Sequence, residues 1–295
     1  MATSPTVRQP TWPEHLRSRR WTRRFNSVVV FLILTGLAFV VVGIPLGWMV
    51  ITALKVRTQV FAWPPVYWPN PIRWQNFADV LTNLPMLRFA ANSLLIASLN
   101  IVGNLLSCTI VAFAFARMRF PGKNILFMLL LSTLMIPNQI TLLPRFVLFQ
   151  ALGWVGSYLP LIVPAFFGNA FFIFLMRQYI MTIPRDLDEA ARIDGASTWQ
   201  IFTQIILPLC IPPMTVIAVL TFLWNWNSFL DPLIYISNYQ DYTIQLGLNM
   251  LKGRYNIQWN LIMAGSLLGV IPPAVLYFLA QDRLIGGIAN VGIKG

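Results

Sequence analysis

The sequence predicts an all-α membrane protein that crosses the lipid bilayer about six times. It is 57% hydrophobic and only 10% charged, with a mean hydropathy of +0.67. A water-soluble domain of 295 residues could not cover that much apolar side chain. Several apolar runs also reach the roughly 20 residues that a helix needs to cross hydrocarbon, where the backbone must satisfy its own hydrogen bonds.

Six apolar runs are expected to form the spans. Pro137 and Pro144 interrupt the third run, so the sequence also allows an extra interfacial or re-entrant piece before the fourth, which opens at Leu159-Pro160. The first run follows an Arg-rich start but is too long for a secretory signal and lacks a small-x-small cleavage site, so we expect it to stay as an anchor. The expected spans are residues 27–52, 92–116, 124–143, 159–176, 209–230 and 259–280.

The basic residues predict the orientation of these spans. Fourteen of the 21 Lys and Arg residues fall on one side of the expected topology, which places both termini and the segment 177–208 in the cytoplasm of a multi-pass inner-membrane protein. Residues 1–25 would be a basic cytoplasmic tail and residues 26–295 the transmembrane domain. The net charge of +12 therefore indicates topology and contact with membrane lipid, and we expect no nucleic-acid partner.

Catalytic and metal chemistry find no support in the sequence. Cys108, Cys210 and the single histidine, His15, share no metal-ligand spacing. We therefore expect no metal, no cofactor and no catalytic residue. The sequence contains no G-x-x-x-x-G-K-[ST] phosphate loop, so ATP hydrolysis is not expected of this chain. An ion-coupled carrier would show inverted repeats and mid-membrane charges, and a membrane enzyme would show a polar catalytic cluster; neither pattern is visible.

The segment between the first two spans is rich in Trp and Pro, as is typical of the headgroup zone. Within it, Asn70 is predicted to cap a short interfacial helix with Pro71 at its first position. That helix would place Trp74, Phe77 and Leu81 on one side.

A charged segment from 184 to 200 is predicted to form two short helices joined at a glycine corner. Pro184 suits a first helical position, and Asp188 with Arg192 forms an i,i+4 pair. Gly195 is expected to adopt a positive φ and end the first helix, and Ser197 with Gln200 predicts a capping box for the second. One stripe of the first helix is made of small or short side chains, namely Leu187, Ala190, Ala191 and Asp194. An amphipathic loop on lipid headgroups is the alternative, which the alanines and acids of this segment disfavour.

Three motifs in and after this segment resemble the EAA loop of permeases from ATP-binding-cassette importers. They are Glu189-Ala190-Ala191, Asp194-Gly195-Ala196 and Leu207-Pro208-Leu209. Further stretches resemble the carbohydrate branch of that superfamily, specifically the maltose-transporter type of inner-membrane subunit. They are Met135-Ile136-Pro137, Phe222-Leu223-Trp224-Asn225-Trp226-Asn227-Ser228-Phe229 and Ile293-Lys294-Gly295.

The resemblance implies a permease subunit of an ATP-driven importer for a carbohydrate, polyol or glycerol-phosphate solute. Residues 184–208 would form the EAA coupling loop. Its coupling helix would contact the ATPase through Glu189, Ala190, Ala191, Asp194, Gly195 and Ala196. The implied partners are a related permease subunit in a heterodimer, two cytoplasmic ATPase subunits and an extracytoplasmic solute-binding protein.

Polar residues inside two spans are candidates for the lining of a translocation pathway, because polar groups there are costly unless they face protein or water. Ser93, Asn100, Asn104 and Ser107 share one side of the second span, and Thr221, Asn225 and Ser228 share one side of the fifth. Trp224 and Trp226 flank the second set and could stack on a sugar ring. The alternative for each polar residue is a hydrogen bond between helices. Gly265 and Gly269 predict close helix packing, and Asp231 is read as the polar end of the fifth span.

Overall fold

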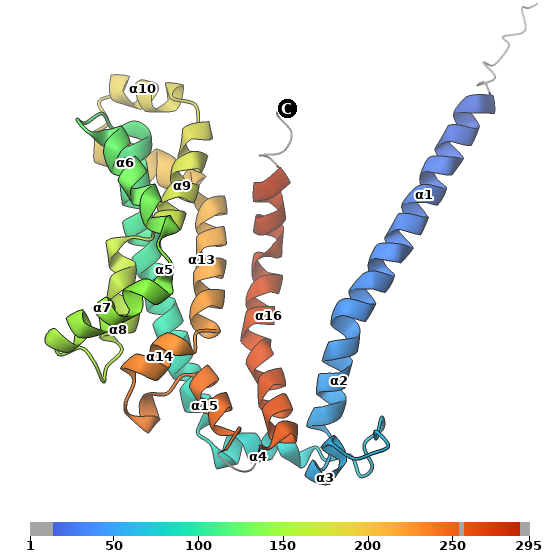
Figure 1. The fold of residues 1–295 in the computed structure, drawn as a ribbon. Helices are drawn as coiled ribbons and strands as arrows, with labels where there is room; N and C mark the ends of the chain where they lie inside the picture. The colour runs from blue at the N-terminus through green and yellow to red at the C-terminus, as the bar shows by residue number, and fades with distance from the viewer. Residues whose placement is uncertain (1–13, 254–256, 290–295) are drawn as a thin grey trace, which may run out of the picture.

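The computed structural model describes residues 14–253 and 257–289, and it describes their side chains from residue 26 to 281. In this part of the chain every regular element is a helix (Figure 1). Four helical stretches are long and apolar enough to cross a membrane, and two bent helix pairs raise the number to six if each pair is one span. The four are Asn26–Ala53, Met86–Arg117, Leu159–Thr182 and Trp259–Gln281.

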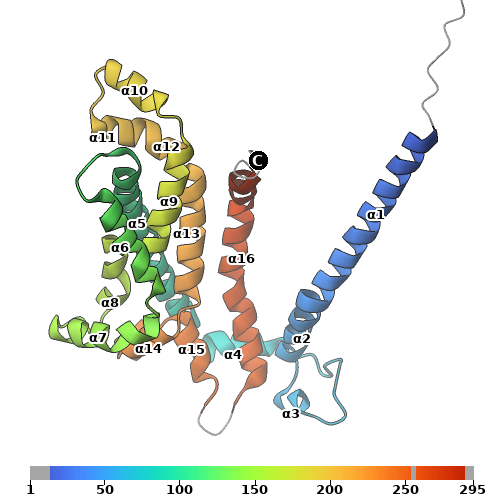
Figure 2. The same ribbon diagram turned by 45° about the horizontal axis from the view of Figure 1, so that its top comes forward.

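The first span belongs to one long helical rod that leans away from the other helices (Figures 1 and 2). The rod comprises α1 (Glu14–Ala38), the π-helical turn η1 (Phe39–Gly43) and α2 (Ile44–Ala53). Because α1 begins at Glu14, the second half of the predicted basic tail is helical. The rod's apolar side chains are largely exposed, and only its α2 end packs against the rest, through α16 (Trp259–Ala289).

Helix α5 (Met86–Arg117) lies at the centre of the remaining bundle. It packs against α9 (Ala170–Thr182) and α13 (Ile211–Trp226), and α13 packs against α16. Two apolar clusters hold these helices together. Cys108, Phe172 and Ile206 belong to the first, and Phe89, Trp226 and Ile244 belong to the second. Because both clusters take side chains from α5, this helix connects the two ends of the bundle.

The third expected span is not one continuous helix. Helix α6 (Lys123–Ser132) and its 3-10 extension η2 (Thr133–Met135) end before Pro137, and α7 (Asn138–Ala151) turns away by 101°. Proline lacks the N–H that the next helical turn needs, so the chain changes direction there. The interruption expected at Pro137 is therefore confirmed, and α7 is the additional piece that the prolines allowed.

A second bend lies at the start of the fifth expected span, 209–230. The helical stretch Thr198–Leu209 meets α13 at an angle of 72°, just before Pro212 and Pro213. That stretch contains α11 (Thr198–Gln200), the π-helical turn η4 (Ile201–Ile206) and α12 (Leu207–Leu209). Pro208 cannot donate a backbone hydrogen bond, which favours the wider π turn before it.

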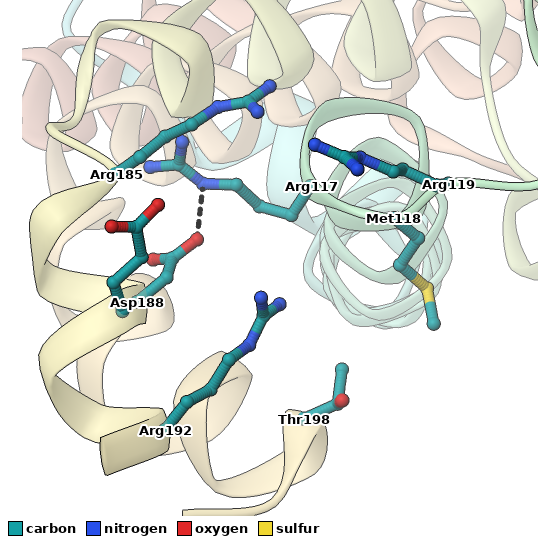
Figure 3. Close-up of a pocket in the computed structure, with 8 residues that line it drawn as sticks. Arg117, Met118, Arg119, Arg185, Asp188, Arg192 and Thr198 are labelled. Carbon is teal, nitrogen blue, oxygen red and sulfur yellow. Dashed lines mark ion pairs between the residues drawn. The ribbon is translucent and has the colours of Figure 1, made fainter.

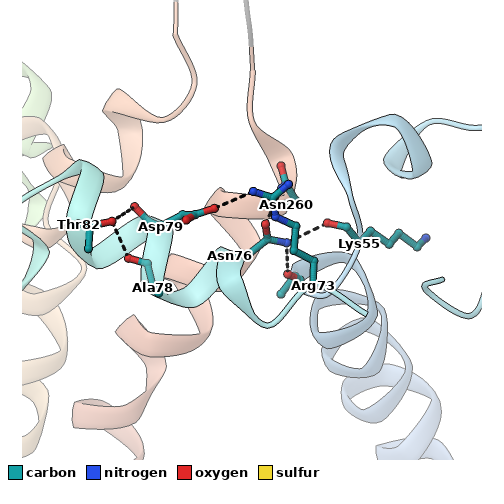
Figure 4. Close-up of polar contacts among 8 residues, drawn as sticks. Lys55, Arg73, Asn76, Ala78, Asp79, Thr82 and Asn260 are labelled. Atoms are coloured by element: carbon teal, nitrogen blue, oxygen red, sulfur yellow. Dashed lines mark hydrogen bonds and ion pairs between the residues drawn. The ribbon is translucent and has the colours of Figure 1, made fainter. Parts of the chain in front are cut away.

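The segment between the first two spans contains α3 (Arg57–Val60) and α4 (Gln75–Asn83). The predicted start of α4 at Pro71 is wrong, because the helix begins at Gln75 with Trp74 as its N-cap. Asn76 donates to the carbonyl oxygens of Ala53 and Lys55 at 2.7 and 2.8 Å, which fixes α4 against the end of α2 (Figure 4). Asn260 donates to the Asn76 side chain at 3.1 Å, so three helices meet at one buried amide.

Helix α4 packs onto the rest of the protein through a different side from the one that carries Trp74 and Leu81. Asn76 and Val80 are its buried residues, whereas Trp74 and Leu81 are exposed. The remaining elements are α8 (Leu159–Ile162), η3 (Val163–Phe167), α10 (Asp186–Ile193), α14 (Leu230–Tyr235), η5 (Tyr239–Asp241) and α15 (Ile244–Met250).

Candidate functional site

A cavity of about 330 Å³ lies inside the bundle, between α5, η3, α13 and α14. All five residues predicted to line a pathway border this cavity, namely Asn100, Asn104, Thr221, Asn225 and Ser228. Asn100 donates its amide to the carbonyl oxygens of Ile96 and Leu161, both at 2.9 Å, and Asn225 donates to the backbone carbonyl oxygen of Thr221 at 2.8 Å. Since the amide N–H groups are used within the protein, the amide oxygens of both asparagines are left as acceptors.

Three buried hydroxyl groups around the cavity have no hydrogen-bond partner within the described residues. They belong to Thr221, Tyr235 and Thr243, which are 1%, 2% and 3% exposed. A buried hydroxyl without a partner costs about 1–3 kcal/mol. The three oxygens are themselves covered by protein, so water or the hydroxyls of a solute would supply the missing hydrogen bonds once a movement of the cavity wall uncovers them.

An aromatic pair adds a flat apolar wall to the polar cavity. The rings of Trp224 and Phe172 stack with centroids 5.1 Å apart, and Trp224 is half exposed. Trp226 does not belong to this wall. It is buried and donates its indole N–H to the Gly269 carbonyl at 2.9 Å, so its role is to join α13 to α16.

Two serines of α5 form hydrogen bonds to neighbouring segments, as the alternative interpretation expected. Ser107 donates to the carbonyl oxygens of Gly103 and Ala165 at 2.7 and 3.0 Å, which joins α5 to η3. Ser93 borders the cavity but accepts from the backbone N–H of Ile244 at 2.9 Å. Pathway lining and helix pairing therefore coexist on one side of α5.

A charged pair at the cavity was not predicted. Arg145 of α7 lies 3.9 Å from Asp231 of α14, and both side chains are partly exposed. Asp231 was expected at the polar end of the fifth span, and no role was predicted for Arg145. Only the turn between α6 and α7 brings the arginine to the cavity, which no local pattern indicates.

The loop that supplies Thr243 is held near the cavity by Tyr158. The Tyr158 hydroxyl donates to the backbone carbonyl of Asp241 at 3.1 Å. Burial, together with the nearby Asp241 carboxylate, raises the pKa of Tyr158 to about 12. The phenol therefore stays protonated, and remains a donor, across the physiological pH range.

The second candidate site is the charged segment, which forms α10 and α11 as predicted. Gly195 has φ +83°, and Ala196 donates its N–H to the Ala191 carbonyl at 2.9 Å, which closes the end of α10. Ser197 and Gln200 form the predicted capping box in both directions. The segment lies across one end of the bundle (Figure 2).

Two details of α10 differ from the prediction. Asp188 pairs with Arg117 of α5, at 3.1 Å between Oδ2 and Nε, and not with Arg192 (Figure 3). Ala191 is 9% exposed and packs into the first apolar cluster, so it faces this chain's own core. The outward residues are Glu189, Ala190, Asp194 and Gly195, with Ala196 partly covered.

Comparison with protein-family models gives one match. Residues 108–285 match the binding-protein-dependent transport system inner membrane component. The matched region includes α10 and every cavity residue that α9, α13 and α14 supply. The predicted C-terminal motif, Ile293-Lys294-Gly295, lies outside both the matched and the described residues.

Curated relatives match nearly the whole chain. The osmoprotective compounds uptake permease protein GgtD of Synechocystis is 33% identical and covers 94% of this chain and 95% of its own length. The arabinooligosaccharides transport system permease protein AraQ of Halalkalibacterium halodurans is 31% identical, covering 92% and 99%. The sn-glycerol-3-phosphate transport system permease protein UgpE of Escherichia coli is 30% identical, covering 93% and 99%.

A solved structure confirms the fold. A chain in the crystal structure of a bacterial ABC transporter involved in the import of the acidic polysaccharide alginate has a TM-score of 0.75 and 21% identity, covering 93% of this chain and 99% of its own. Members of this family are transport components and not enzymes. The chain belongs to the binding-protein-dependent transport system inner membrane component family and is a membrane-spanning permease subunit of an ABC importer.

Proposed function

We propose that this permease lines part of the path of a polyhydroxylated solute, a carbohydrate or a related polyol or glycerol phosphate. One observation carries the proposal: five polar residues predicted from two separate helices border a single cavity that also holds three unpartnered hydroxyls. A solute rich in hydroxyl groups would satisfy both these hydroxyls and the free amide oxygens of Asn100 and Asn225. The names of the relatives, which include arabinooligosaccharides and sn-glycerol 3-phosphate, support this solute class.

The aromatic wall supports the same proposal. A sugar ring has an apolar face of C–H groups, and the exposed part of Trp224 offers a flat surface for it. The Arg145–Asp231 pair would lie beside the solute, where each charge offsets the other. A cavity that combines asparagine amides with an aromatic surface fits a solute whose hydroxyls and ring faces alternate.

We also propose that α10 is the coupling helix, which docks onto a cytoplasmic ATPase. Its outward face carries Glu189 and Ala190, and two large apolar side chains nearby, Ile193 and Trp199, are 86% and 62% exposed. Exposed apolar groups at the end of a bundle are typical of an interaction surface. Ala191 contributes from the inside, because its small side chain lets α10 lie close to the core.

The proposed assembly contains a related permease subunit as heterodimeric partner, two ATPase subunits, an extracytoplasmic solute-binding protein and surrounding lipid. A second structural neighbour, with a TM-score of 0.66, is the bacterial alginate ABC transporter in complex with a periplasmic protein that is bound to alginate pentasaccharide. Both chain ends are proposed to be cytoplasmic. The N-terminal end of α1, the C-terminal end of α16 and α10 all lie at the same end of the molecule, which supports this orientation (Figure 1).

Cysteine cross-linking tests the coupling role with a control inside the same helix. Single cysteines at Glu189 and Ala190 are placed in a background that lacks Cys108 and Cys210, in membranes that also contain the partner permease and the ATPase. Both are outward positions, so cross-links to the ATPase that change with ATP are expected. A cysteine at Ala191 is the matched control, because this position is buried in the chain's own core and should not cross-link.

Two results would contradict the coupling role. Equal cross-linking at Ala190 and Ala191 would indicate that α10 is not held as described. Labelling of Glu189 and Ala190 by lipid-soluble reagents alone, with no cross-link to the ATPase, would favour the amphipathic loop on the membrane surface.

A further inference from the structure

A buried ion pair joins α10 to the end of α5. Arg117 Nε lies 3.1 Å from Asp188 Oδ2, and the two side chains are only 4% and 7% exposed. The same guanidinium donates through Nη2 to the carbonyl oxygen of Ile183, at 2.8 Å, where the segment leaves α9. One side chain of α5 therefore holds both the start of the charged segment and its first helix (Figure 3).

The pair is the ionic attachment of α10 within the described residues. Asp188 Oδ1 is buried and has no hydrogen-bond partner there, so Arg117 is the charged partner of this carboxylate. A buried carboxylate that loses its cation is strongly disfavoured, which makes separation of the two groups costly. Asp188 and Arg117 must therefore move together or the pair must break.

The rest of α10 is less closely held. A cavity of about 400 Å³ lies beside the pair, between α10, the start of α11 and the end of α5. Arg117 and Asp188 border it together with Arg119, Arg185, Glu189, Arg192 and Thr198. Ala191 adds an apolar contact to the bundle beside Asp188. Apolar contacts can slide, whereas a buried ion pair resists separation of its two charges. A force on the exposed side of α10 would thus reach the bundle through two contacts, the ion pair of Asp188 and the apolar packing of Ala191.

Helix α5 runs unbroken from this pair to the cavity. Asn104 precedes Arg117 by 13 residues on α5, or about 20 Å of helix at 1.5 Å per residue. Arg177 of α9 donates to the Phe115 carbonyl at 3.3 Å, which fixes α9 to the last turns of α5. Since both helices also contribute to the cavity wall, a displacement at Arg117 would move cavity residues.

We propose that Arg117 and Asp188 are positioning residues for transport coupling: the pair transmits the displacement of α10 to α5 and thereby to the polar cavity. The proposal rests on the coupling role of α10. Neither residue borders the polar cavity. The pair is expected to determine how much the accessibility of the cavity changes with ATP. Substitution of the pair should not affect ATP hydrolysis or ATPase docking.

A cysteine at Asn104, in a background without Cys108 and Cys210, reports on the cavity. The rate of its modification by a small water-soluble thiol reagent is measured in the assembled complex with and without ATP. Asp188→Asn keeps the shape but removes the charge, and should reduce the ATP-dependent change in rate by about tenfold. Asp188→Glu keeps the charge, and Arg119→Ala removes an arginine that lies near the pair but outside it, so both should stay within about twofold of the unmodified chain.

A double-substitution cycle separates coupling from folding. Arg117→Gln combined with Asp188→Asn leaves a neutral pair, and its defect should be no larger than that of Asp188→Asn alone. ATPase cross-linking at Glu189→Cys should persist in every variant.

A full ATP-dependent change in Asp188→Asn, or an equal loss in Arg119→Ala, would overturn the proposal. If Asp188→Asn fails to fold, the neutral pair of Arg117→Gln with Asp188→Asn takes its place, because it leaves no buried unpaired charge. It should show a loss of about fivefold or more; an unchanged response would overturn the proposal. Absence of any ATPase cross-link in the unmodified complex would instead overturn the coupling role of α10.

Discussion

The charged segment and the polar cavity lie at different ends of the same central helix and are built in opposite ways. The segment takes its shape from neighbouring residues: Gly195 ends α10, and Ser197 with Gln200 begins α11. The cavity collects side chains from residue 93 to residue 243, on several elements. Interactions between neighbouring residues therefore shape the charged segment, and packing between distant elements shapes the cavity.

The two regions also differ in what they leave unsatisfied. On α10 and α11 the unpaired features are exposed apolar groups such as Ile193 and Trp199. In the cavity they are buried hydroxyls such as those of Thr221 and Tyr235. The first kind is relieved by a protein surface and the second by a polar solute or water, so each region indicates a different class of partner.

The largest expected effect is at the local site. Gly195→Val places a β-branched residue at φ +83°, a strain of about 1–3 kcal/mol that corresponds to roughly a 5- to 150-fold change in equilibrium. Solute uptake by the assembled complex should fall accordingly while membrane insertion persists. Gly195→Asn is the matched control, because asparagine tolerates a positive φ and no atom lies within 4 Å of the added Cβ. Undiminished uptake by the valine variant would contradict the claim that the charged segment depends on the local backbone conformation at Gly195.

A packing change should affect the cavity and leave the charged segment intact. A Cβ on Gly103 would lie 2.8 Å from the Phe166 ring and 3.1 Å from the Ala165 backbone, so Gly103→Ala must push η3 away from α5. We expect a loss of about 1–3 kcal/mol in stability, measured as a lower thermal unfolding midpoint in detergent. Gly269→Ala is the control, since its Cβ would meet Ile244 at an ordinary 3.6 Å. Equal midpoints for the two variants would contradict the close packing of α5 on η3.

The smallest expected effect on stability is at a cavity hydroxyl. Thr221→Val removes a buried group that has no partner among the described residues, so stability should stay constant or rise by up to about 1 kcal/mol, while solute uptake falls. Thr215→Val is the control on the same helix, because that hydroxyl bonds to the Ile211 carbonyl at 2.9 Å and lies away from the cavity. Lower stability with unchanged uptake in Thr221→Val would mean that the hydroxyl serves the fold and not the solute.

Much of this molecule was predictable because hydrophobic run length, glycine and capping residues act locally. The helical membrane fold, the glycine corner and the capping box all followed from such signals. The five residues that border the cavity were singled out because polar side chains repeat on one side of two apolar helices. Arg145, Tyr235 and Thr243 were missed because each reaches the cavity only through a turn or loop whose direction depends on packing.

The pairing of Asp188 was missed for a related reason. Sequence spacing offers Arg192 as an i,i+4 partner, a contact that is weak when exposed to water. In the folded chain the end of α5 brings Arg117 to the same carboxylate in a buried setting, where the interaction is far less screened. Local rules indicate which residues are charged, and the tertiary arrangement decides which charges meet.

Side-specific labelling of a single cysteine at Asn225 tests the central claim most directly. Asn225 borders the cavity on α13, and the measurement compares its modification by a membrane-impermeant thiol reagent from each side of a sealed vesicle, with and without ATP. If the cavity is part of an alternating pathway, ATP should change the side from which this position is labelled. Labelling that is equal in both conditions, or absent from both sides, would contradict the assignment of this cavity to the path of the solute.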